Sequence, residues 1–290
     1  MKRLGAVTKI AGVLVVVGLA LFAASSLLGP ALGFEYEKMD YTMEAAGIQG
    51  IKIKARNMPV EVLVSGADDV TIHFYTSDKD PYEVSLNKGQ LTLEYKRDDL
   101  TAITNWLFGG LNAVNKADVK VNVLVPAEYS GRIRLDTSNA SVKVSGLTKA
   151  DDLDINTSNG AIALSDVLAS RISARTSNGA VTLDKVTASG AVDVSSSNGA
   201  LTAKEVNAAE KLRMETSNGR IVVDHVASSD ILFESSNGAI SGGVEGKRAD
   251  YTVSSRTSNG DNILGDGGFG ARKLTVNTSN GSIDIRFLGE

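Results

Sequence analysis

Cysteine is absent from the 290-residue sequence, and proline, histidine and aromatic residues are scarce. A chain without cysteine has no disulfide scaffold, no thiolate zinc site and no cysteine for lipid attachment. Aromatic residues make up only 5% of the chain although 42% is hydrophobic, which suits a thin core of Val, Ile, Leu and Ala. The net charge of −4, from 30 basic and 34 acidic residues, provides no global positive field to attract nucleic acid.

Residues 1–34 predict a transmembrane anchor. An uncharged run begins at residue 10, and its most apolar part, residues 10–28, is close to the roughly 20 residues that span a bilayer core. Three cations precede this run: Lys2, Arg3 and Lys9. They favour a cytoplasmic N-terminus and export of everything that follows. A cleaved signal peptide, with small residues at 23–25 near the cut, is the alternative and leads to the same compartment.

A tetrapeptide repeat dominates residues 137–290. The motif Thr/Ser-Ser-Asn-Gly recurs every 19 to 22 residues, with Ala140 in place of the glycine in the first copy. Its eight asparagines are Asn139, Asn159, Asn178, Asn198, Asn218, Asn237, Asn259 and Asn280. Self-similarity at a fixed period indicates a repeat architecture, in which each unit is stable only beside its neighbours.

Apolar residues alternate on both sides of each motif, as in 153–155 before and 162–164 after one copy. Period-two alternation is typical of a half-buried strand, so each repeat is predicted as strand, corner, strand, Asn-Gly corner. We attribute the Asn-Gly corner to the tolerance of both residues for positive φ. An antiparallel meander is the alternative. Equal repeat lengths favour an all-β, single-stranded parallel β-solenoid (β-helix) of ~20-residue coils, whose asparagines stack as a structural ladder.

The region before the repeats is predicted as a linker at 35–47, followed by degenerate coils or a β cap at 48–136 that covers the solenoid end. Residues 51–62 repeat the order strand, asparagine, strand without the glycine. None of the four prolines lies within the repeats, where a missing N–H would break the strand ladder. They are Pro30, Pro59, Pro81 and Pro126.

An apolar insertion at 100–116 interrupts this region. It holds the only tryptophan, Trp106, followed by Leu107 and Phe108. Such a segment can dock on a membrane or a partner protein. The alternative is that it folds down and covers the apolar end of the first coil.

No pattern in the sequence predicts catalysis, a metal site or a cofactor. The only dense acidic group, residues 151–154, is explained as a solvated turn, and His73 and His225 lack metal-ligand spacing around them. The motif lacks the aspartate of calcium-binding repeats. Its threonines are predicted to face inward, unlike the outward rows of ice-binding solenoids. We therefore predict a protein that is not an enzyme.

The layout resembles the DUF4097 family of bacterial candidate adhesins. The features that carry the resemblance are the apolar N-terminal segment, the Ile-x-Ile…Asn…Val-x-Val opening at 51–62, the strand ending in Val125-Pro126, and the Thr-Ser-Asn-Gly copies. The resemblance covers essentially everything after residue 45. It implies a cell-envelope setting, as for LiaG-type proteins of envelope-stress operons, and it implies no catalytic residues.

The sequence favours a non-catalytic, single-pass protein of the bacterial cell membrane with an extracytoplasmic, adhesin-like binding or scaffold module. Its partner would be an envelope component or a membrane protein, and not nucleic acid. An accessory or regulatory component of an envelope-stress response, acting through a membrane partner, is the alternative. A carbohydrate-active β-helix enzyme is a weaker one, because it requires carboxylates clustered on an exposed face.

Overall fold

The computed structural model describes residues 36–77, 80–96 and 119–290. The chain divides into two compact units. The first unit consists of Met1–Glu37, Thr76–Pro81 and Lys96–Asp118, of which only a few residues are described, among them an antiparallel bridge between Ser77 and Asp80. The second unit consists of Lys38–Tyr75, Tyr82–Tyr95 and Val119–Glu290. The predicted span at 10–28 and the apolar insertion at 100–116 lie outside the described residues.

The prediction of an all-β protein is confirmed. The described residues form nineteen strands of one sheet system and two short 3-10 helices. No helix among them is long and apolar enough to cross a bilayer. The elements are β1 (Glu37–Glu44), η2 (Ala45–Gly47), β2 (Gly50–Lys54), β3 (Val60–Ser65), β4 (Asp69–Thr76), β5 (Tyr82–Asn87), β6 (Gln90–Tyr95), β7 (Val121–Pro126), β8 (Arg132–Asp136), β9 (Val142–Ser145), β10 (Ala150–Thr157), β11 (Ile162–Thr176), β12 (Val181–Ala188), β13 (Ala191–Ser196), β14 (Leu201–Thr216), β15 (Ile221–Ser235), β16 (Ile240–Val244), η4 (Arg248–Asp250), β17 (Tyr251–Arg256), β18 (Arg272–Thr278) and β19 (Ile283–Phe287).

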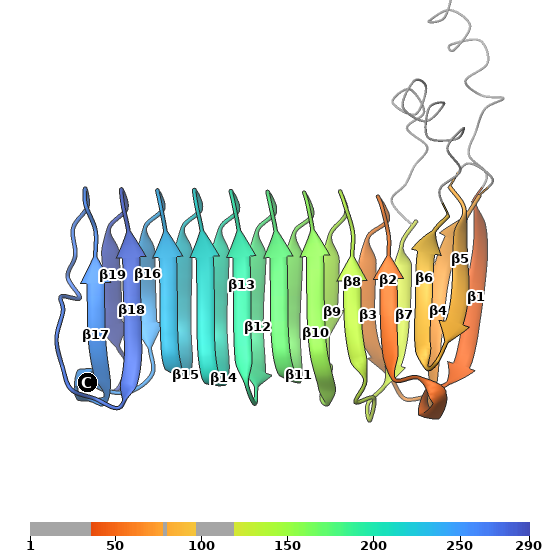
Figure 1. The fold of residues 1–290 in the computed structure, drawn as a ribbon, viewed down its shortest axis with the longest axis horizontal. Helices are drawn as coiled ribbons and strands as arrows, with labels where there is room; N and C mark the ends of the chain where they lie inside the picture. The colour runs from red at the N-terminus through yellow and green to blue at the C-terminus, as the bar shows by residue number, and fades with distance from the viewer. Residues whose placement is uncertain (1–35, 78–79, 97–118) are drawn as a thin grey trace, which may run out of the picture. The chain divides into compact units, whose positions relative to one another are not determined.

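The strands of successive repeats lie side by side (Figure 1), and equivalent repeat positions are paired in register. Ile162 of β11, for example, pairs in parallel with Val142 of β9 and Val181 of β12. Successive coils are therefore about 4.8 Å apart. We call this arrangement the coil stack. Its front face is the outward side of the strands that precede each motif: β8, β10, β13, β17, β18 and the C-terminal halves of β11, β14 and β15.

The first residue of each motif points inward and closes the corner. The Thr176 Oγ1 accepts a hydrogen bond from the Gly179 N–H at 3.1 Å and donates one to the Gly160 carbonyl of the neighbouring coil at 3.0 Å. Thr157, Thr176, Thr216 and Thr278 are only 6–8% exposed, so the predicted inward orientation is confirmed for these four threonines, whereas Thr257 of the same row is half-buried. Serine occupies the same place at Ser196 and Ser235, with the same two bonds.

The explanation of the Asn-Gly corner by positive φ is wrong. None of the eight described motif corners has a residue with positive φ. The left-handed residues lie instead at the other corner of the coil: Asp166, Lys185, Glu205 and His225. The motif glycine is required for a different reason. A Cβ at Gly179 would lie well inside van der Waals contact of the Gly160 carbonyl oxygen, because the coils approach most closely at this point.

Both ends of the stack depart from sequence order. At one end, β2 lies between β6 and β8, and β3 lies between β7 and β9. At the other end, β18 lies between β15 and β17, so the last motif in the sequence is not the last in space (Figure 1). Strand pairing is also not parallel throughout, since β4 pairs with β7 and β5 with β6 in antiparallel fashion.

Candidate functional site

The predicted asparagines lie in one exposed row along the stack. Each donates its side-chain N–H to the side-chain oxygen of the preceding coil, as Asn178 does to Asn159 at 2.6 Å and Asn198 to Asn178 at 2.7 Å. The row also includes Asn57, which accepts from Asn139 at 2.8 Å. Because all the bonds run in one direction, the amides polarise one another. The ladder thus links the coils by hydrogen bonds, and its amide groups still face the solvent.

Ion pairs cover the front face over the coils of β8 to β13. Arg134 lies 2.9 Å from Asp136 and 3.2 Å from Asp154. Arg175 lies 3.7 Å from Asp154 and 3.4 Å from Asp193. The hydrogen bond with Asp136 is the main cause that raises the pKa of Arg134. Such exposed pairs each contribute at most about 1 kcal/mol to folding stability. Each of these carboxylates nevertheless has an arginine within ion-pair distance.

The acidic group at 151–154 belongs to the same network. The Arg171 guanidinium donates to both carboxylate oxygens of Asp152, at 2.8 and 3.2 Å. This hydrogen bonding lowers the pKa of Asp152. Arg132 lies 3.7 Å from both Asp151 and Asp152. The group is therefore not a free pair of acids on which general acid–base chemistry could rest.

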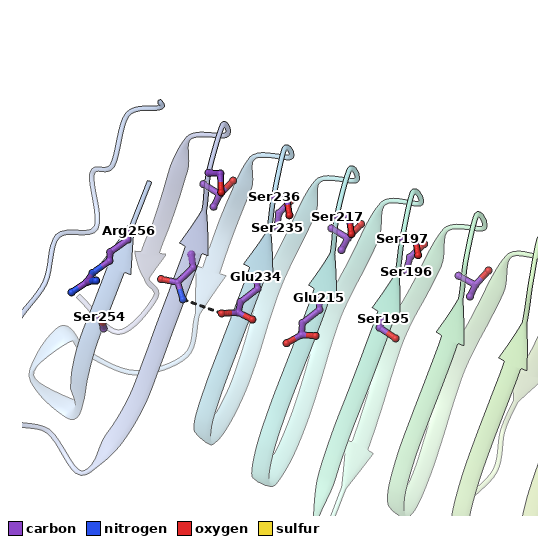
Figure 2. Close-up of a pocket in the computed structure, with 15 residues that line it drawn as sticks. Ser195, Ser196, Ser197, Glu215, Ser217, Glu234, Ser235, Ser236, Ser254 and Arg256 are labelled. Carbon is purple, nitrogen blue, oxygen red and sulfur yellow. Dashed lines mark hydrogen bonds between the residues drawn. The ribbon is translucent and has the colours of Figure 1, made fainter. Parts of the chain in front are cut away.

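A polar groove runs across the coils where the front-face strands enter the motif corners (Figure 2). Its volume is about 720 Å³, and six neighbouring strands contribute to it. Serine and threonine dominate the lining, with two glutamates, one asparagine and one arginine. The lining residues are Thr176, Ser195, Ser196, Ser197, Glu215, Thr216, Ser217, Glu234, Ser235, Ser236, Ser254, Arg256, Asn277, Thr278 and Ser279.

The ion-pair pattern of the front face changes inside this groove. Glu215 still pairs with Arg213 at 2.5 Å. Glu234, its register partner on the next coil, accepts a hydrogen bond from the Asn277 amide at 3.1 Å and has no ion pair among the described residues. Arg256 lies one coil beyond Asn277 and is exposed. The groove thus carries one glutamate and one arginine that form no ion pair with a described residue, although Arg213 also interacts electrostatically with Glu234.

The described residues offer no metal centre. No group of three or more His, Cys, Asp or Glu side chains among them is placed to hold an ion. His73 Nδ1 lies 2.5 Å from Asp40, and His225 Nδ1 lies 2.8 Å from Asp224. Each histidine has its own aspartate, and the two pairs are on different coils.

Sequence reasoning identified the asparagine row but missed the groove. All groove residues but Ser254 stand one, two or three places before a motif asparagine. A comparison of the third position from coil to coil would have isolated Glu234 and Arg256. Trp106, Leu107 and Phe108, the predicted partner or membrane contacts, lie outside the described residues.

The stacked strands and the repeated inward threonines define an all-β protein built from repeated coils. The chain belongs to the DUF4097 family, since the family model described as Toastrack DUF4097 matches residues 48–261. The resemblance seen in the sequence is therefore confirmed. No curated protein matches the chain.

Several crystal structures match most of the chain. A candidate adhesin from Bacteroides fragilis is 13% identical, with a TM-score of 0.49, and the match covers 86% of this chain and 97% of that one. A candidate adhesin from Parabacteroides merdae is 11% identical, with a TM-score of 0.43 and coverage of 87% and 96%. A candidate cell adhesion protein from Clostridium sporogenes is 10% identical, with a TM-score of 0.36 and coverage of 87% and 100%.

Proposed function

We propose that this protein is a non-catalytic, adhesin-like binding or scaffold module that the bacterial cell membrane displays on its outer side. The coil stack is, in this proposal, a parallel β-solenoid whose surface is the binding device. The groove is the observation that carries the proposal. Six strands present hydroxyl, amide and charged groups there at a regular spacing, which suits recognition of an extended chain. The ion-paired acids elsewhere on the front face favour recognition over acid–base catalysis.

The proposed location rests on the N-terminal sequence. The apolar run at 10–28 is long enough to span a bilayer, and the cations before it favour retention of the N-terminus in the cytoplasm. Everything after residue 34 would then face the cell envelope. The alternative function is an accessory role in an envelope-stress response, with the insertion at 100–116 as the contact to a membrane partner.

The test uses the full chain in mild detergent as cross-linkable bait for the envelope fraction of its host. Ser217→Trp fills the groove. Thr182→Trp adds the same bulk at an exposed position of β12, outside the groove. We expect Ser217→Trp to abolish capture and Thr182→Trp to retain it. Because the proposed function is non-catalytic, the captured material should be chemically unchanged. Capture that is indifferent to Ser217→Trp but lost on deletion of residues 100–116 would favour the alternative function and refute the groove.

A further inference from the structure

The charges of the groove identify a cationic group of its ligand. Glu215 and Glu234 are directly opposed on neighbouring parallel strands, about 4.8 Å apart along the stack. Like charges in this arrangement repel each other. Arg213 pairs with Glu215 at 2.5 Å, lies 3.9 Å from Asp193 and also interacts electrostatically with Glu234, so its single positive charge is shared among three acids. An ammonium group that lies between the two glutamates would remove the repulsion.

The opposite charge lies two coils further along. Glu234 is in register with Asn277, and Asn277 is in register with Arg256. The Glu234 carboxylate and the guanidinium are thus separated by about 9.6 Å along the stack, and the point midway between Glu215 and Glu234 lies about 12 Å from the guanidinium. Arg256 forms no ion pair with any described residue, and Ser254 of the same strand also lines the groove. The site therefore presents an anion-binding end and a cation-binding end at a defined spacing.

The spacing and the lining match a peptide. An extended chain rises about 3.3 Å per residue, so the two charged ends of a tripeptide are roughly 7–10 Å apart. With a contact of about 3 Å between its carboxylate and Arg256, a tripeptide spans the roughly 12 Å from the point between the two glutamates. The serine hydroxyls and the Asn277 amide between the charged ends both donate and accept hydrogen bonds, as backbone amides require. The described lining contains no aromatic ring on which the apolar face of a sugar could pack.

We propose that the groove binds short peptides lengthwise, with the amino group against Glu215 and Glu234 and the carboxylate against Arg256. This proposal rests on the binding function proposed above and specifies its ligand. Both ends of the peptide contribute recognition, and the hydroxyl rows between them accept different side chains.

The probe is tri-alanine, measured by equilibrium dialysis of the isotopically labelled peptide against the full chain in mild detergent. We expect saturable binding that is weakened about fivefold by Glu234→Gln and about fivefold by Arg256→Gln. Acetylation of the amino group should remove the effect of Glu234→Gln only, and amidation of the carboxylate should remove the effect of Arg256→Gln only. Glu205→Gln and Arg220→Gln change the same charges outside the groove and should leave binding unchanged.

The proposal is overturned if tri-alanine does not bind saturably, or if the doubly blocked peptide binds as well as the free one. It is also overturned if the control variants weaken binding as much as the groove variants. If tri-alanine fails while Ser217→Trp still abolishes envelope capture, the ligand class is wrong and the binding function stands. If Ser217→Trp leaves capture unchanged, the binding function itself is wrong.

Discussion

Replacement of Gly199 by alanine tests why the motif needs glycine. Gly199 does not have positive φ, so the backbone conformation alone would accept alanine. A Cβ at this position would, however, overlap the carbonyl group of Gly179 on the neighbouring coil. The two coils must move apart to admit the methyl group, and this movement lengthens or breaks the buried hydrogen bonds that join them.

Three hydrogen bonds at this corner set the magnitude. The Gly199 N–H donates to Ser196 at 2.8 Å, Ser196 donates to the Gly179 carbonyl at 3.0 Å, and Thr216 donates to the Gly199 carbonyl at 3.1 Å. Each contributes about 1 kcal/mol, and a buried partner left unpaired costs about 1–3 kcal/mol. We therefore expect Gly199→Ala to lower the free energy of unfolding by about 3–5 kcal/mol.

The assay is urea unfolding of the full chain in mild detergent, followed by the circular dichroism of the strands. Gly66→Ala is the matched control, because Gly66 has no atom within 4 Å of its added Cβ and no positive φ. Its effect should stay within about 0.5 kcal/mol, or be slightly stabilising. A loss below about 1 kcal/mol for Gly199→Ala would refute the close-approach explanation.

Three further predictions concern the ladder, the inward row and the ion pairs. Asn198→Ala removes one bond to Asn178 and one from Asn218, and should lower the urea midpoint by the equivalent of about 1–2 kcal/mol; an unchanged midpoint would mean that solvent replaces the ladder. Thr216→Val should cost about 1–3 kcal/mol because it leaves the Gly219 N–H unpaired, whereas Thr216→Ser should be nearly neutral, as serine serves at other coils; equal losses would contradict this role of the hydroxyl. The pKa of Asp152 is lower in the folded protein than in the unfolded chain, where it is about 3.9. Its ion pair therefore stabilises the fold fully above the unfolded pKa, and this stabilisation is lost as the pH falls through the lower folded pKa. Asp152→Asn should therefore reduce stability near neutral pH by less than about 1 kcal/mol and make stability fall less steeply with decreasing pH, and a steeper fall would contradict this prediction.

The sequence predicted most of what repeats. Strand positions, the corner and the asparagine row all follow from a motif that recurs at nearly constant spacing, since equal coils place equal residues side by side. The order of coils at the two ends could not be predicted, because the strand pattern of residues 50–65 fits equally well beside several neighbours. Asn57 was not predicted as part of the ladder, because it joins the row only through the position of β2 beside β8.

The groove depends on contacts that the linear sequence hides. Glu234 and Asn277 are 43 residues apart, and they become neighbours only because β18 inserts between β15 and β17. The acids at 151–154 stood out in the sequence, but the arginines that pair with them lie on other coils. Local density of charge in the sequence was therefore a poor guide to the charged residues that form no ion pair with a described residue.

Site-specific photo-cross-linking in living host cells tests the central claim most directly. A photoreactive residue at Ser217 lies in the groove, and one at Thr182 lies outside it. We predict discrete adducts with an envelope component from position 217, their loss when Glu234→Gln and Arg256→Gln are combined, and none from position 182. Adducts of equal yield from both positions, or from position 182 alone, would contradict the claim that the groove is the binding surface.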